Sequence, residues 1–188
     1  MTVGFALCGS FCTFSQVFPV MEQLAQTHQL IPILSPVVCA VNSRFGTAAS
    51  HLQRVSEICG CDPIMSVQEA EPIGPKKLLD ALVIAPCTGN TLSKLAHSVA
   101  DTAVTMAAKS HLRNGRPVVI AISANDALAG AAENIGRLLA RKNYYFVPFG
   151  QDDAMNKPTS LVADFGLIPE ALNHALMGKQ IQPLLLGR

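Results

Sequence analysis

The sequence predicts an α/β fold in three layers, α/β/α, with a doubly wound parallel sheet flanked by helices. Four short apolar runs, 3–7, 29–34, 82–85 and 118–122, are each bounded by Gly, Pro, Ser or Asn, as buried strands are. Longer stretches with helical periodicity lie between these runs. Because the runs show no polar alternation, both faces of each strand must be covered, which is typical of a parallel sheet between two helical layers.

Two further strands are expected at 64–67 and 144–147, which gives a sheet of five or six strands. After residue 148 the chain turns polar, and helical spacing resumes at 168–177. We therefore expect the whole chain, 1–188, to form one domain, with a loop and helix at about 149–188 as a C-terminal excursion.

Composition and charge argue against several classes of protein. Hydrophobic residues make up 49% of the chain and charged residues 14%, a balance that indicates a filled interior and not a disordered chain. A net charge of +1 offers no basic field for nucleic acid, so no such partner is expected. No apolar run approaches the roughly 20 residues of a membrane span, and the N-terminus lacks a basic signal region. A cytoplasmic protein without membrane attachment is expected.

The thiol and imidazole groups show no recognisable pattern for metal binding or covalent catalysis. Cys59 and Cys61 are separated by one residue, which is too close for the usual paired metal ligands, and no second pair follows. No Cys-His or Ser-His-Asp arrangement is apparent. We expect reduced cysteines, no metal, and His51 on a polar helix face.

Ligands of open α/β sheets bind beyond the carboxyl ends of the strands, so the loops there are the candidate sites. In the first loop, Gly9 allows close backbone approach, Ser10 supplies a hydroxyl, and the next helix begins with free N–H groups that can bind an anion. The loop matches neither of the glycine-rich phosphate motifs. An ordinary capped turn explains it equally well.

The second strand is followed by Ser35, whose hydroxyl is expected near the strand end because Pro36 turns the chain away. Arg44 precedes the next helix and is one of few cations near this edge of the sheet. A solvated surface arginine is the simpler interpretation of Arg44.

The loop after the third strand is the most informative. The side chains of Thr88, Asn90 and Thr91 can hydrogen-bond a phosphate or the edge of a heterocycle. Pro86 and Cys87 offer a flat, largely apolar surface to an aromatic ring. Helix capping explains only one of these polar groups. We therefore expect a ligand here, and the fourth loop, at 123–126 after the run at 118–122, adds the amide of Asn125 at the same edge of the sheet.

These loops resemble those of the flavin-dependent cysteine decarboxylase superfamily. Residues 85–96 match its pattern Ala-Pro-x-Thr-x-Asn-Thr-x-x-Lys-x-Ala, and the Gly-Ser pair of the first loop matches as well. The resemblance implies a Rossmann-like, flavodoxin-like fold that binds FMN and forms a homo-oligomer. The predicted FMN-binding residues, from loop position and resemblance together, are Gly9, Ser10, Phe11, Ser35, Pro86, Cys87, Thr88, Gly89, Asn90, Thr91 and Ser123.

The chain departs from the decarboxylases where they carry a His-Ile pair, because residues 71–77 read Glu-Pro-Ile-Gly-Pro-Lys-Lys. Their Pro-x-Met-Asn segment survives only as Ser-Ala-Asn at 123–125. A flavin-dependent decarboxylase or a flavin prenyltransferase remains an alternative, since one fold hosts several reactions. A non-catalytic subunit that binds phosphate or nucleotide is a third hypothesis.

Further segments resemble the B-subunit family of dipicolinate synthases, at 43–48, 147–153, 157–164 and 178–183. This resemblance covers nearly the whole chain. It implies an FMN-binding oxidoreductase subunit that acts during sporulation with a dipicolinate synthase A subunit, which binds pyridine nucleotide. The pair would oxidise a dihydrodipicolinate-type precursor to dipicolinic acid.

Four residues are candidates for roles beyond cofactor binding in this hypothesis. Asn90 and Asn125 are the polar candidates for catalysis beside the flavin ring. Arg44 and Lys157 are the nearest cations in sequence for binding a small dicarboxylate substrate.

Overall fold

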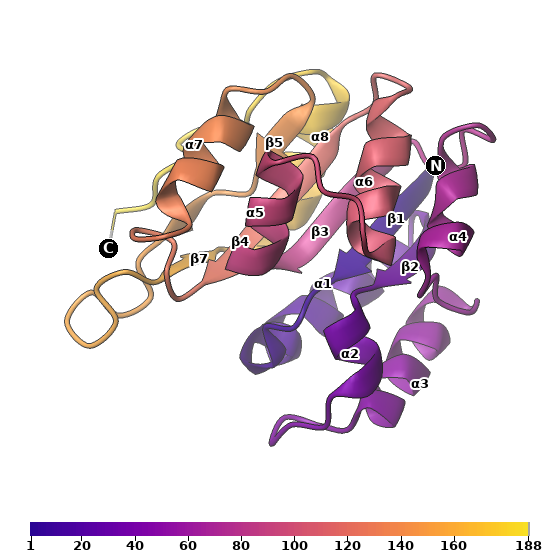
Figure 1. Cartoon of the computed structure of the whole chain (residues 1–188), viewed down its shortest axis with the longest axis horizontal. Helices are drawn as coiled ribbons and strands as arrows, with labels where there is room; N and C mark the ends of the chain where they lie inside the picture. Colours follow the sequence, from indigo (N-terminus) through magenta and orange to yellow (C-terminus); the bar gives the residue numbers. More distant parts are fainter. Residues whose placement is uncertain (188) are drawn as a thin grey trace.

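The sheet of the protein is built around five parallel strands in the order β2-β1-β3-β4-β5 (Figure 1). The structure is a computed structural model and describes residues 1–187. This strand order is that of a flavodoxin-like doubly wound sheet, which is the expected fold class, although the order itself was not predicted. The strands are β1 (Thr2–Leu7), β2 (Gln29–Leu34), β3 (Ala81–Cys87), β4 (Val118–Ala124) and β5 (Tyr144–Phe146).

Two short antiparallel strands extend the sheet, which is therefore mixed and not wholly parallel. Strand β7 (Leu161–Ala163) pairs with the carboxyl end of β4, beyond the point where β5 stops, and β6 (Phe149–Gly150) pairs with β7. Both strands lie in the part of the chain that we expected to be a loop excursion. Their few residues and lack of alternation give no periodicity signal.

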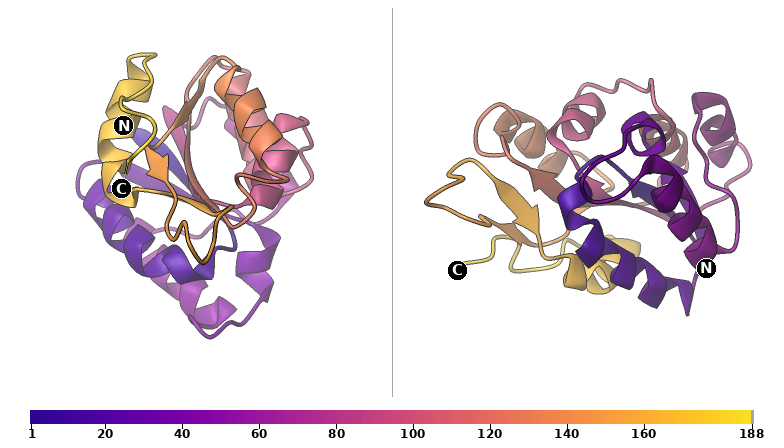
Figure 2. Two further views of the ribbon diagram at one scale, coloured as in Figure 1. Left: turned by 90° about the vertical axis from the view of Figure 1, so that its left-hand side faces the viewer. Right: turned by 90° about the horizontal axis from the view of Figure 1, so that it is seen from below.

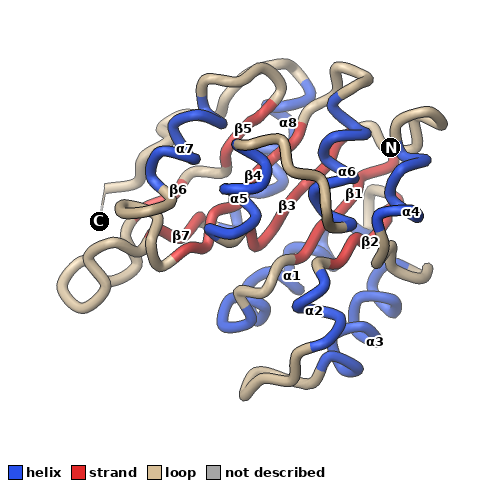
Figure 3. The backbone as a smooth tube through the Cα atoms, in the orientation of Figure 1, coloured by secondary structure: helices blue, strands red, loops and turns tan. Residues whose placement is uncertain are grey.

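Helices cover both faces of the sheet, as Figures 1, 2 and 3 show. One face carries α1 (Phe14–Ala25) and α8 (Ile168–Leu176), which contact each other and β3. The other face carries α5 (Gly89–Ala96), α6 (Ala103–Leu112) and α7 (Ala132–Leu139). The remaining helical segments are α2 (Pro36–Ala40), α3 (Ala48–Cys59), α4 (Val67–Ala70) and the 3-10 turns η1 (Phe11–Thr13), η2 (Glu71–Ile73) and η3 (Phe165–Leu167).

The strand expected at 64–67 is wrong. Ile64 forms a single bridge to Ile33, and Val67 already begins α4. A capping box accounts for this helix start: Ser66 Oγ accepts from Glu69 N at 3.2 Å, and Glu69 Oε2 accepts from Ser66 N at 2.9 Å. The Ser-x-x-Glu spacing of Ser66 and Glu69 is present in the sequence. It favours a helix start here, whereas the apolar pair Ile64-Met65 before it suggested a strand.

The core follows from the central position of β3 and β4, in which every residue is buried. Their small and branched apolar side chains pack against helices on both faces, which is why these runs show no alternation. The C-terminal segment closes one edge: Phe149 N donates to Leu184 O at 3.0 Å, and Leu186 N donates to Phe149 O at 2.9 Å. Among residues 1–187, no helix has the length and apolarity to cross a bilayer.

Candidate functional site

A cleft of about 1160 Å³ opens at the carboxyl edge of the sheet. The first, third and fourth predicted loops all line it, together with the turn at 43–45. Parallel strands bring these loops to one edge although they are far apart in the chain. The 151–160 loop, here called the flap, and the C-terminal residues 186–187 form the opposite wall.

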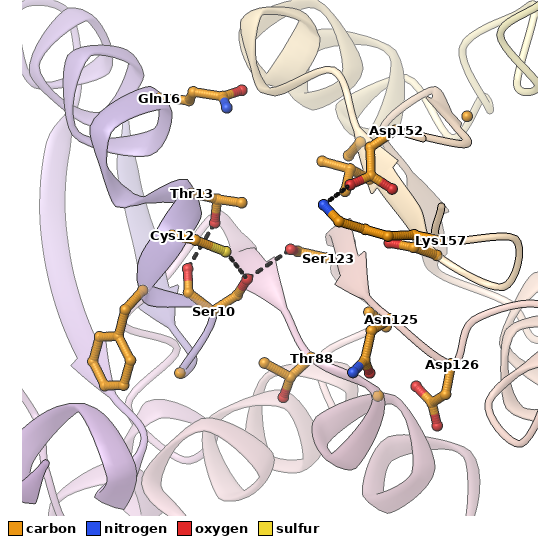
Figure 4. Close-up of a pocket in the computed structure, with 18 of the residues that line it drawn as sticks. Ser10, Cys12, Thr13, Gln16, Thr88, Ser123, Asn125, Asp126, Asp152 and Lys157 are labelled. Carbon is orange, nitrogen blue, oxygen red and sulfur yellow. Dashed lines mark hydrogen bonds and ion pairs between the residues drawn. The ribbon is translucent and has the colours of Figure 1, made fainter. Parts of the chain in front are cut away.

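The first loop meets the end of β4 across the intervening strand β3. Gly9 lies tight against α2, where an added Cβ would come within 2.5 Å of Val37 Cγ1. The hydroxyls of Ser10 and Ser123 are hydrogen-bonded at 2.7 Å, and Thr13 Oγ1 donates to Ser10 O at 2.8 Å. Figure 4 shows Ser10 and Ser123 facing each other in the cleft. One of the two hydroxyls donates to the other, so the pair keeps one hydrogen that can be donated to a ligand.

The third loop contributes Thr88, Gly89 and Asn90 to the cleft wall, at the start of α5. A Cβ on residue 89 would come within 2.6 Å of Asp126 Oδ1, so the two residues lie in close contact. The carboxylate of Asp126 therefore lies beside the N-terminal turn of α5, where the helix dipole favours negative charge. A second anion would be repelled from this helix end.

Three predicted cofactor-binding residues of the same segment do not line the cleft. Pro86 and Cys87 are buried within β3. Thr91 is also buried, and its hydroxyl donates to Cys8 Sγ at 3.3 Å, which ties α5 to the end of β1. Thr88 Oγ1 donates in turn to Thr91 Oγ1 at 3.3 Å. These side chains support the loop from behind, and their contact with a cofactor remains a prediction.

Ser35 also lies off the cleft wall. Its backbone N–H donates to Leu7 O at 3.0 Å, which fixes the start of α2 against β1. Its hydroxyl is buried and has no hydrogen-bond partner among the described residues. A buried hydroxyl without a partner costs about 1–3 kcal/mol, so this group is available to a ligand or a bound water.

Phe11 lines the cleft and is backed by an aromatic cluster. Its ring stacks on the imidazole of His51 with centroids 5.6 Å apart, and Phe14 meets the same imidazole edge-on at 4.9 Å. His51 is 4% exposed, so its expected place on a polar helix face is wrong. Burial lowers the pKa of His51. The buried residues of α3 are Ala48, His51 and Val55, which share one face at helical spacing, so His51 lies on the apolar face and not on the polar one.

The two candidate cations both reach the cleft, but they differ in their partners. The Arg44 guanidinium stacks over the ring of Phe45 at 4.8 Å, on an exposed turn at the rim. Lys157 Nζ lies 3.0 Å from Asp152 Oδ2. This contact raises the pKa of Lys157. Burial alone would raise the pKa of Asp152, but hydrogen bonds from Lys157 and Ser160 lower it below its usual value. Asp152 therefore compensates the charge of Lys157.

The flap is anchored to the fourth loop. Thr159 Oγ1 donates to Asn125 O at 2.7 Å, and Leu128 N donates to Thr159 O at 2.9 Å. Gln151 Nε2 bonds Pro158 O at 2.8 Å across the base of the flap. Asn125 lines the cleft below Lys157, as Figure 4 shows. The sequence placed Asn125 and Lys157 in separate motifs, and the fold brings both to the same cleft.

Several lining residues were not predicted. Asp126 follows Asn125 in the fourth loop, and Cys12 follows Phe11 in the first, and no role was predicted for either. Residues 162–164 and 186–187 reach the cleft through β7 and the C-terminal segment, and these long-range pairings leave no local signal. Asp152 lies in the segment 147–153, which carries part of the family resemblance, but no role was predicted for it.

The thiols nearest the cleft differ in exposure. Burial raises the pKa of Cys8 to about 11, and it raises that of Cys87 further above the usual thiol value. Neither is a thiolate at neutral pH. Cys12 is exposed and lines the cleft. Within residues 1–187 no three His, Cys, Asp or Glu side chains gather as metal ligands.

Comparison with known families and sequences places these features in context. The family model described as Flavoprotein matches residues 1–162. The B subunit of dipicolinate synthase from Bacillus subtilis (strain 168) is 46% identical over 185 residues, which cover 98% of this chain and 92% of that protein.

Solved structures agree with this relationship. The crystal structure of the dipicolinate synthase B subunit from Bacillus halodurans C superposes with a TM-score of 0.91 at 45% identity, covering 100% of this chain and 96% of that one. The FMN-dependent cysteine decarboxylase SpaF gives a TM-score of 0.69 at 23% identity, covering 93% and 97%. The second similarity concerns the fold alone.

Proposed function

The chain belongs to the flavoprotein family, and from this premise we propose that it is the FMN-binding subunit of a dipicolinate synthase. It would oxidise a dihydrodipicolinate-type precursor to dipicolinic acid during sporulation, together with an A subunit that binds the pyridine nucleotide. The observation that carries the proposal is the cleft itself, in which the predicted first, third and fourth loops come together.

The residues of the cleft fit a flavin mononucleotide. The volume of the cleft, about 1160 Å³, exceeds the roughly 300–1,000 Å³ of most small-molecule sites. The cleft therefore has room for a nucleotide beside a second small ligand. The hydroxyl pair of Ser10 and Ser123 can donate to the cofactor. The hydroxyl of Ser35, which has no hydrogen-bond partner among the described residues, lies at the end of β2. Because Asp126 repels anions from the start of α5, we assign the phosphate to the Ser10 and Ser123 side.

A bound flavin supplies a two-electron acceptor, which is the chemistry that oxidation to an aromatic ring requires. The chain itself would position the reactants. Asn90 and Asn125 present amides from two sides of the cleft, where they can hydrogen-bond the edge of a ring, and Phe11 provides an apolar wall. The flap, tied to the fourth loop by Thr159, would exclude water from the reacting groups.

The charges of the cleft support a need for the partner subunit. Arg44 and Lys157 are its lining cations, whereas Asp126, Asp152 and Asp164 are lining acids. A dicarboxylate substrate therefore finds no net positive charge here, and the ion pair with Asp152 already engages Lys157. We propose that the A subunit supplies further cations when it covers the cleft.

Decarboxylation of cysteine-ended substrates is not supported by the cleft. Residues 71–77, which replace the histidine pair of the decarboxylases, do not line it, and Ile73 is fully buried in η2. No histidine of residues 1–187 is among the lining side chains. Loss of a positioned acid or base typically costs about 10²–10⁴-fold in rate.

The test is an absorbance titration of the purified chain with FMN, with and without the A subunit. Saturable binding with a perturbed flavin spectrum is expected. If the spectrum of FMN is unchanged by the chain in both conditions, the proposed cofactor role is refuted, and a non-catalytic partner subunit takes its place.

A further inference from the structure

A second hollow lies at the opposite edge of the sheet from the cleft. It encloses about 490 Å³ between the last turns of α5 and α6, the segment 98–100 and residues 141–144 at the amino end of β5. Figure 1 shows α5 and α6 next to each other on one face, joined by the loop that borders this hollow. The cleft lies at the carboxyl ends of the parallel strands, whereas the hollow lies at the amino end of β5. No residue lines both sites.

All charged side chains that line the hollow are cationic. Lys109, Arg113, Arg141 and Lys142 gather here, in a chain whose net charge is only +1. Among residues 1–187, none of the four forms an ion pair with a carboxylate. A concave surface with charges of one sign focuses its potential and attracts counter-ions.

Stabilisation of helix ends explains part of this cluster. Lys109 and Arg113 stand at the end of α6, and Arg141 donates to Leu95 O at 3.0 Å and to Ala96 O at 2.6 Å at the end of α5. It does not explain Lys142, which caps no helix. Stabilisation of helix ends also does not require a hollow between the helices.

Apolar side chains lie beside these cations in the lining of the hollow. Leu95, Val99 and Leu112 line it, and Val99 is 43% exposed although it is aliphatic. Tyr144 adds an aromatic ring, and burial raises the pKa of its phenol, so the hydroxyl stays a neutral donor. A hollow of this volume is the size of a small-molecule site.

We propose that the hollow is a second binding site, for a small organic anion that combines one flat ring with carboxylate groups. The ring would pack against the side chains of Leu95, Val99 and Tyr144. The carboxylates would face Arg113 and Lys142, because a guanidinium fork matches a carboxylate in plane and spacing. The site stands independently of the proposed function, which supplies only the choice of probe.

The probe is pyridine-2,6-dicarboxylate, which carries one ring and two carboxylates. The chain contains no tryptophan, so Val99→Trp places a single reporter at the hollow, and its emission follows binding there alone. A saturable change is expected at low ionic strength. Adding Arg113→Gln and Lys142→Gln should weaken binding about tenfold or more, since each removes a charge-assisted hydrogen bond.

The matched control removes two exposed lysines elsewhere, Lys76→Gln with Lys179→Gln, and should leave the affinity within about twofold because distant surface charges are largely screened. Calorimetry on the chain that retains Val99 repeats the titration without the reporter. Equal affinity of the hollow variant and the control would overturn the proposal. So would orthophosphate that competes as well as the dicarboxylate, because the ring would then contribute nothing.

An FMN titration of the same variants separates this site from the cleft. Retained FMN binding with lost reporter response supports two sites. Loss of both responses in the hollow variant would overturn the proposal, because one site would then account for both ligands. If the wild-type chain binds no FMN either alone or with the A subunit, the proposed function fails, while the reporter still tests the hollow.

Discussion

Replacing Ser10 by Asp should abolish the retention of FMN. Ser10 Oγ lies 2.7 Å from Ser123 Oγ in a niche where Ser123 is only 7% exposed, so a carboxylate at residue 10 would face the phosphate at close range. Two unit charges about 4 Å apart repel by about 4 kcal/mol at an effective dielectric of 20. That energy corresponds to about a thousandfold loss of affinity.

The assay is flavin absorbance or fluorescence titration of wild type, Ser10→Asp and Ser10→Ala. The alanine variant removes one hydroxyl and leaves Ser123, so a loss of about 1 kcal/mol, about fivefold in affinity, is expected. Ser56→Asp on α3, outside the cleft lining, adds the same charge and controls for a general electrostatic effect. If folded Ser10→Asp binds FMN within about threefold of wild type, the assignment of the phosphate to this niche is refuted.

Three further predictions concern assembly, packing and pH. We expect a homo-oligomer, so light scattering should give a mass above 19.9 kDa, and a monomer at all concentrations would contradict this. Gly89→Ala should lower the free energy of unfolding in urea by no more than about 1 kcal/mol, because the added Cβ meets only the carboxylate end of Asp126, at 2.6 Å, and this exposed side chain can turn away; a loss above about 2 kcal/mol would contradict this. His111 is fully buried, and burial lowers its pKa to about 4 in the folded state. In the unfolded state the pKa of this imidazole is near 6.5, so the unfolded chain binds the proton at a higher pH than the folded chain. Stability should be full above about pH 6.5 and fall by about 2 kcal/mol by pH 5, and His111→Gln should flatten this dependence in denaturant titrations.

Local patterns were sufficient to predict most of the parallel sheet. The runs at 3–7, 29–34, 82–85 and 118–122 all lie within observed strands, because strands buried on both faces are uniformly apolar. The run at 64–67 failed because a capping box starts a helix at Val67, and a four-residue apolar signal cannot distinguish the two outcomes.

The candidate site was predictable where it depends on loops that follow strands. Ser10, Thr88, Asn90, Ser123 and Asn125 line one cleft because parallel strands share an edge. Side-chain direction within a loop was not predictable, since packing decides whether a residue such as Thr91 faces the cleft or the adjacent strand. The walls formed by β7 and the C-terminal segment arise from long-range pairing, which leaves no periodicity in the sequence.

The most direct test of the central claim is the formation of dipicolinate by purified subunits. The A subunit, the precursor and the pyridine nucleotide are incubated with this chain and FMN, or without the chain. We predict that dipicolinate forms only with the chain present, and that Asn90→Ala and Asn125→Ala each reduce the rate when it is measured at saturating FMN. A rate with the A subunit alone that equals the rate of the pair would contradict the account.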